Sequence, residues 1–169
     1  VSHPEFTASP PYLCLGDTVF FTNTSIAQPG AIYNWDFGPD ATPSNFTGTT
    51  PPGVVFSTDG VHTIDLILTD ACGIDTFSLD YSVFALPLAD AGNDTIICAA
   101  DTIMIGALPL AGYTYAWTPS GTLDDPSLSN PMAAISGNQQ YIVEVTDGFT
   151  GCVNHDTIDV TLITFSVDI

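Results

Sequence analysis

Hydrophobic and polar residues alternate along several short stretches of the chain. A period of two is typical of strands that bury one face of a sheet. The clearest stretches are 18–21, 62–69 and 141–146, and in the second of these one face carries His62, Ile64, Leu66 and Leu68. Clusters of Pro, Gly, Asn and Asp separate the stretches, and no segment has convincing helical spacing with caps. The pattern therefore predicts an all-β chain of short strands.

Three landmarks of the sequence occur twice. They are Cys14, Trp35 and Cys72 in the first copy and Cys98, Trp117 and Cys152 in the second, which lie 84, 82 and 80 residues further along. A repeat of about 82 residues suits a small sandwich. We therefore predict two tandem Ig-like β-sandwich domains, residues 1–86 and 87–169, with the two tryptophans in their cores. Pro87 interrupts the strand pattern near the boundary.

The charge narrows the functions that are possible. The chain has 19 acidic residues and no Lys or Arg, which gives a formal net charge of −19. Binding to nucleic acid or to anionic lipid requires cationic side chains, so both are excluded as partners. No apolar run is long enough for a membrane-spanning helix. The chain also lacks a starting Met and a signal peptide, so we expect a mature product or a fragment of a longer protein.

Four cysteines form an even set, which predicts disulfides in an oxidising, extracellular compartment. One pairing joins Cys14 to Cys72 and Cys98 to Cys152, within each copy. A second pairing joins Cys14 to Cys152 and leaves Cys72 and Cys98 for flanking repeats or neighbouring subunits. The first is slightly preferred because both copies carry the same two cysteines. The second avoids joining points that lie at opposite ends of an Ig-type sandwich, farther apart than a disulfide allows.

Two runs of the first copy carry a family resemblance. The run YNWDFG at 33–38 resembles the YxWDFGDG hallmark of polycystic-kidney-disease type (PKD) domains, and GVHTIDLILTD at 60–70 resembles their GxYxVxLxVxD strand. Two departures are Pro39-Asp40 in place of Asp-Gly and His62 in place of the usual Tyr. The second copy lacks WDFG. Its runs AGNDT at 91–95, followed by Cys98, WTP at 117–119 and NP at 130–131 resemble Ig-like repeats of large Bacteroidetes surface proteins. These proteins include exported adhesins and gliding-motility proteins, often delivered by the type IX secretion route.

The resemblance implies a calcium site, because acids of the hallmark loop and of the end of strand F hold calcium in some PKD-like domains. Carried over by position, these acids are Asp36 and Asp70, with Asp40 one residue late. A weaker analogue in the second copy comprises Asp124, Asp125 and Asp147. Calcium binds six to eight oxygens, mostly of carboxylates and carbonyls. The other interpretation is that these residues cap turns.

Asp-Thr followed by an aliphatic residue occurs four times. The motif resembles the Bacteroidetes O-glycosylation signal, and the acceptors that this implies are Thr18, Thr95, Thr102 and Thr157. The other interpretation is that the same dipeptide opens strands without carrying any sugar.

Nothing in the sequence marks a catalyst, since nucleophile elbows, zinc-protease motifs and phosphate loops are missing. We therefore expect a non-enzymatic, extracellular structural or adhesive repeat segment of a long bacterial surface protein or fibre. Its expected partners are neighbouring repeats or identical subunits, in end-to-end assembly. We expect no required cofactor, and calcium is the candidate ligand considered above. The alternative is an accessory carbohydrate-binding module of a secreted hydrolase, with Tyr113, Phe149 and Phe46 as aromatic contacts to glycans.

Overall fold

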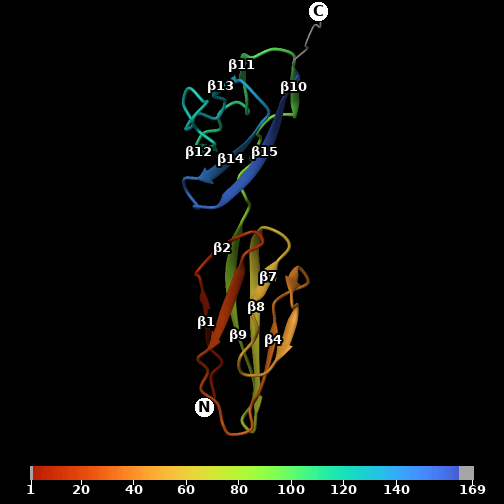
Figure 1. The fold of residues 1–169 in the computed structure, drawn as a ribbon. Coiled ribbons are helices and arrows are strands. Elements are labelled where there is room, and N and C mark those ends of the chain that lie inside the picture. Colours follow the sequence, from red (N-terminus) through yellow and green to blue (C-terminus); the bar gives the residue numbers. More distant parts are fainter. Residues whose placement is uncertain (1, 164–169) are drawn as a thin grey trace, which may run out of the picture. The chain divides into compact units, whose positions relative to one another are not determined.

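A computed structural model describes residues 2–163 of the chain (Figure 1). Every secondary-structure element in this range is a β-strand. The chain divides into two compact units, Val1–Ala85 and Leu86–Ile169. The sequence pattern places the boundary one residue later. Among the described residues there is no helix of the length and hydropathy that crossing a membrane would require.

The first unit contains two sheets. One sheet has the order β1-β3-β7-β5, with β1 at Phe6–Ser9, β3 at Thr18–Asn23, β7 at Val54–Phe56 and β5 at Ala41–Thr42. The other has the order β2-β9-β8-β4-β6, with β2 at Leu13–Cys14, β9 at Gly73–Phe84, β8 at Gly60–Asp70, β4 at Ile32–Asp36 and β6 at Asn45–Thr47. In immunoglobulin terms these orders read A-B-E-D and A′-G-F-C-C′. The unit is therefore an Ig-like β-sandwich.

The predicted alternation in β8 is confirmed, because Ile64, Leu66 and Leu68 are all at most 1% exposed. Strand β8 pairs along its whole length with β9, from Gly60 opposite Val83 to Asp70 opposite Gly73, and the two form the long hairpin of Figure 1. A hairpin of this length presents one continuous apolar row to the opposite sheet.

The core of the first unit is aromatic. Trp35 is 2% exposed, stacks against Phe37 with ring centroids 6.0 Å apart, and also contacts Phe6 at 5.0 Å. Its indole Nε1 donates a hydrogen bond to the carbonyl of Gly48 at 2.9 Å. The buried indole thus keeps its polar atom satisfied, which is the usual condition for burying Trp.

The second unit repeats the plan with fewer strands. One sheet has the order β10-β15-β14-β12, with β10 at Thr95–Ile97, β15 at Val153–Leu162, β14 at Gln139–Asp147 and β12 at Tyr113–Thr118. The other consists of β11 at Asp101–Met104 and β13 at Met132–Ile135. These correspond to strands A′, G, F and C on one side and B and E on the other.

The two tryptophans occupy the same place in the two units. Trp117 is 2% exposed and lies opposite Val143 of β14, as Trp35 lies opposite Leu66 of β8. The Nε1 of Trp117 donates to the carbonyl of Leu128 at 2.9 Å. Both tryptophans therefore fill the core from strand C, as the sequence predicts.

A glycine allows the chain to pass close to Trp117. Gly106 has a φ of +79°, and a Cβ at this position would collide with the carbonyl oxygen of Ser129 and lie 2.8 Å from Cζ2 of Trp117. Only glycine meets both conditions, because other residues disfavour positive φ and carry the Cβ that would clash.

Candidate functional site

A carboxylate closes the turn before the last strand of each unit. In the first unit Asp70 accepts hydrogen bonds from the hydroxyl of Ser2 and from the backbone N–H groups of Cys72, at 2.8 Å, and Gln28, at 3.2 Å. The Ser2 hydroxyl, followed by the Cys72 N–H, lowers the pKa of the Asp70 carboxyl below its ordinary value. These bonds stabilise the charged form, so Asp70 acts as a cap of the turn.

Asp147 has the same role in the second unit. Its Oδ1 accepts the N–H of Phe149 at 2.7 Å and that of Thr150 at 3.3 Å. The Phe149 N–H is the main cause of the lowered pKa of the Asp147 carboxyl. The two turn carboxylates were proposed above as calcium ligands. Both oxygens of Asp70 accept hydrogen bonds from the protein, and the Oδ1 of Asp147 accepts from its own turn.

The structure does not assemble the predicted calcium site of the first unit. Asp36 lies opposite Asp65 in the register of β4 and β8, and Asp70 is five residues further along β8. At about 3.3 Å per residue this separates them by roughly 16 Å, whereas calcium ligands lie within about 2.6 Å of the ion. The Oδ1 of Asp36 instead accepts the N–H of Gly38, and the carbonyl of Asp40 accepts from Ser57. Asp36 and Asp70 were carried over from a family pattern, but the direction of β8 places Asp70 well away from Asp36 along the sheet.

The acids proposed as the weaker calcium site of the second unit also accept hydrogen bonds from nearby residues. Asp124 accepts the N–H groups of Asp125 and Met132, and Asp125 accepts from the hydroxyl and the N–H of Ser127. The Ser127 hydroxyl lowers the pKa of the Asp125 carboxyl. Within residues 2–163, no group of three or more His, Cys, Asp or Glu side chains is arranged to hold a metal ion.

The cysteines of each unit lie at opposite ends of its last strand. Cys14 pairs with Phe84, the final residue of β9, while Cys72 directly precedes Gly73, the first. In the second unit Cys98 follows Ile97, which pairs with Leu162 at the end of β15, and Cys152 directly precedes Val153 at its start. We call Cys14 and Cys98 the strand-end cysteines, and Cys72 and Cys152 the turn cysteines.

This placement corrects the preferred disulfide pairing. Strand β9 has 12 residues and β15 has 10, so the two cysteines of one unit are roughly 30 Å or more apart. A disulfide requires Cα atoms within about 7 Å. In the structure Cys14 and Cys152 are disulfide-bonded, whereas Cys72 and Cys98 are free and exposed. Neither intradomain pair therefore forms.

The four threonines of the Asp-Thr motif lie in or at strands. Thr18, Thr102 and Thr157 are exposed, so their hydroxyls are accessible to a modifying enzyme. Thr95 is half-buried, and its hydroxyl donates to the carbonyl of Asn93 at 2.9 Å. Glycosylation of all four threonines stays a prediction.

Two of the three aromatic residues proposed for glycan contact lie on neighbouring segments at one end of the second unit. Tyr113 begins β12 opposite Asp147, and Phe149 lies in the turn that follows, where it is 90% exposed. The N–H of Gly148 donates to the carbonyl of Gly112 at 2.8 Å and ties the two segments together. Tyr113 is half-buried and packs against the core of the second unit. Phe46 is likewise half-buried and packs against the core of the first unit.

His62 and His155 contact neighbouring residues of their own units. The His62 ring packs on Phe56 with centroids 4.3 Å apart, and its Nε2 lies 3.0 Å from the carbonyl of Thr58. The Nε2 of His155 lies 3.1 Å from the Oε2 of Glu144, within hydrogen-bonding distance, and both side chains are about half exposed. It lies opposite Glu144 in the register of β14 and β15. Exposed pairs of this kind contribute little to stability.

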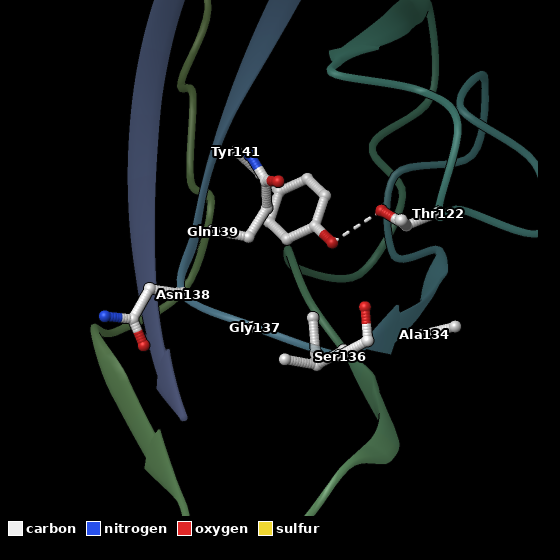
Figure 2. Close-up of a pocket in the computed structure, with 8 residues that line it drawn as sticks. Thr122, Ala134, Ser136, Gly137, Asn138, Gln139 and Tyr141 are labelled. Carbon is white, nitrogen blue, oxygen red and sulfur yellow. Dashed lines mark hydrogen bonds between the residues drawn. The ribbon is translucent and has the colours of Figure 1, made fainter. Parts of the chain in front are cut away.

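A hollow of about 240 Å³ opens beside β13 and β14, and its lining includes Ser136, Gly137, Asn138 and Gln139. In Figure 2 the hydroxyls of Thr122 and Tyr141 face each other, and they are hydrogen-bonded at 2.7 Å. The lining carries hydroxyl and amide groups but no charged side chain. Such a hollow offers hydrogen bonds to a neutral polar group, yet the two hydroxyls already satisfy each other.

An apolar patch in the second unit was missed by the sequence analysis. Leu88, Leu108 and Leu110 surround Tyr115 at a hollow of about 260 Å³, and Leu108 is 80% exposed. The hydroxyl of Tyr115 accepts the N–H of Leu110 at 2.9 Å and holds the loop in place. The signal was present in the apolar run between Gly106 and Gly112, because loops are usually polar.

No family model and no curated protein matches the chain. Among solved structures, one from work on the promiscuous specificity of carbohydrate-binding modules of the β-sandwich superfamily is 22% identical in sequence. The match covers 85% of this chain and 54% of that one, with a TM-score of 0.45. The titin I-band fragment I67–I69 is 11% identical over 96% and 66%, with a TM-score of 0.42. The eight N-terminal Ig domains of the Down syndrome cell adhesion molecule are 10% identical over 96% of this chain and 25% of that one, with a TM-score of 0.47. The chain thus spans about half of the first structure and a quarter of the last, and likeness at this level carries no argument about function.

Proposed function

We propose that the segment is a structural spacer of a long extracellular protein, in which Ig-like sandwiches follow one another end to end. The observation that carries this is the repetition itself: the same sandwich plan occurs twice, with Trp35 and Trp117 at matching positions of strand C. A repeated unit of this kind extends a protein by a fixed length per copy. The closer likeness to PKD-type and Bacteroidetes surface repeats stays a prediction.

Three further properties support an extracellular spacer. Cys14 and Cys152 are disulfide-bonded, which suits an oxidising compartment. The charge of −19 discourages lateral clumping through self-repulsion. The absence of Lys and Arg leaves trypsin-like proteases nothing to cleave. Polar pairs across the strands replace salt bridges, as between Thr63 and Asp80 at 2.7 Å and between Ser78 and Asp65 at 2.6 Å.

The test replaces the two units in the full-length protein by an unrelated pair of sandwiches of equal length. A spacer predicts that surface display and reach are retained after the replacement and are lost when the units are deleted. Loss of function in the equal-length replacement would contradict the proposal, because it would show that the surface of these units is itself required.

A glycan-binding module is the second candidate, and the placement of Tyr113 beside the turn of Phe149 favours it. Exposed aromatic rings are the usual platforms for stacking on sugars, and Phe149 is 90% exposed. Phe149→Ala should abolish binding on a glycan array if this function is correct. Leu108→Ala, which also removes an exposed apolar side chain of the second unit, serves as the control. Wild-type protein that binds no glycan would remove this candidate.

A further inference from the structure

One cysteine of each kind is disulfide-bonded and one of each kind is free. The bonded residues are the strand-end Cys14 and the turn Cys152, and the free ones are the strand-end Cys98 and the turn Cys72. Cys14 and Cys98 are equivalent in register, because Leu13 pairs with Val83 in the same way as Ile97 pairs with Leu162. Each free thiol therefore occupies a position at which the other copy carries a bonded cysteine.

We propose that Cys98 and Cys72 are junction cysteines: Cys98 bonds the turn cysteine of the following copy of the repeat, and Cys72 bonds the strand-end cysteine of the preceding copy. The partner is thus another copy of the same repeat. The inference rests on the proposed function, because it assumes that further copies adjoin the segment at both ends.

The position of the cysteines limits what they can join. Within a unit the turn cysteine and the strand-end cysteine lie at opposite ends of β9 or β15, so no bond between the two kinds can close there. A bond between the two kinds requires the end of one sandwich to meet the opposite end of another. That is the geometry of a head-to-tail array, which can continue without closing.

Both free thiols are presented on surfaces suited to a junction. Cys72 lines a hollow of about 170 Å³ with Ser2 and Ile74, and Asp70 holds its backbone by accepting its N–H. Ile74 is 73% exposed. Near Cys98, the side chain of Ile96 is 66% exposed. Each thiol thus has an exposed isoleucine two residues away in sequence, and end-to-end packing would remove that apolar surface from water.

The oxidation step needs an acceptor for two electrons. Two thiols lose two protons and two electrons and form one S–S bond, while a small disulfide such as oxidised glutathione is reduced to two thiols. Between separate chains of net charge −19 the approach is opposed by repulsion, which salt screens. In an array, the tether raises the effective concentration of the partner thiol, so the junction bond should form faster than between free chains.

The test uses two single variants of the chain, Cys72→Ser and Cys98→Ser, with tags of different size. Each retains one free thiol of one kind, and the double variant Cys72→Ser/Cys98→Ser is the control. The proteins are oxidised with a glutathione redox buffer at high salt, separately and as a mixture. Products are separated without reduction, and the linked peptides are identified by mass spectrometry, which also checks that Cys14 and Cys152 remain in their original bonds.

The proposal predicts that the wild type forms a ladder of oligomers and that the mixture forms mainly heterodimers linked from Cys98 to Cys72, above their statistical share. Each variant alone should give few homodimers, and the double variant should stay monomeric. The proposal would be overturned if homodimers formed at the share expected for random pairing of the two thiols. It would also be overturned if both thiols ended only as adducts with glutathione. That result would leave the spacer function standing, because the replacement experiment above does not depend on these thiols.

Discussion

Replacing Gly106 by Ala tests the packing of the second unit around Trp117. The residue has a φ of +79°, and an added Cβ would collide with the carbonyl oxygen of Ser129 and approach Cζ2 of Trp117 to 2.8 Å. The left-handed conformation costs a residue with a Cβ about 1–2 kcal/mol. Forcing core side chains apart costs about 1–3 kcal/mol more. Gly106→Ala should therefore lower the free energy of unfolding of this unit by about 2–5 kcal/mol.

Gly112→Ala is the matched control. Its φ is +88°, in the same unit, but no atom lies within 4 Å of an added Cβ. This variant should lose only the conformational contribution of about 1–2 kcal/mol. The difference between the two variants isolates the steric clash with the neighbours of Gly106.

Hydrogen–deuterium exchange in a urea series, read by mass spectrometry on the reduced protein, reports the two units separately. Peptides from 86–163 should lose protection at lower urea in Gly106→Ala, whereas peptides from 2–85 should be unchanged. Equal effects of the two substitutions would refute the close approach of the chain to Trp117. An equal loss of protection in the first unit would refute the division into two separately packed cores.

Two further predictions concern charge. The pKa values of Asp70 and Asp147 are lowered in the folded state. Their contribution to stability is therefore present above their unfolded pKa, near 4, and is lost as the pH falls through the folded pKa. Asp70→Asn and Asp147→Asn should lower the urea midpoint at pH 6 but hardly at pH 2, and an equal effect of the exposed control Asp59→Asn would show that the turn bonds contribute nothing. Raising NaCl from low millimolar to 0.15 M should raise the Tm, because the screening length falls to about 8 Å and the repulsion among charges that sum to −19 weakens; a Tm independent of salt would show that this repulsion is negligible in the folded chain.

The strands and cores could be predicted because the signal for them is local. The alternation at Ile64, Leu66 and Leu68 is visible in the sequence, and a strand with this pattern must bury that face. The repeated tryptophans also indicate their own place, because strand C of an Ig-like sandwich carries a core tryptophan.

The calcium ligands and the preferred disulfides could not be predicted because they depend on which end of a strand a residue occupies. Asp36 and Asp70 match a family pattern, yet the direction of β8 separates them. The pairing of Cys14 with Cys72 fails because β9 lies between the two; the sequence already raised this geometric objection, but the matching cysteines of the two copies were given more weight. The apolar patch of Leu108 was missed because the apolar run between Gly106 and Gly112 has no strand or helix periodicity, although its composition is unusual for a loop.

Stretching the reduced chain between its two ends tests most directly the claim that it consists of two separate sandwiches serving as a spacer. Reduction is required because Cys14 and Cys152 are disulfide-bonded. Units of the sizes seen here, Val1–Ala85 and Leu86–Ile169, should unfold in two steps that release nearly equal contour lengths of chain, each about 290 Å at roughly 3.4 Å per residue. A single step that releases the whole chain, or extension without any resisting step, would contradict the account.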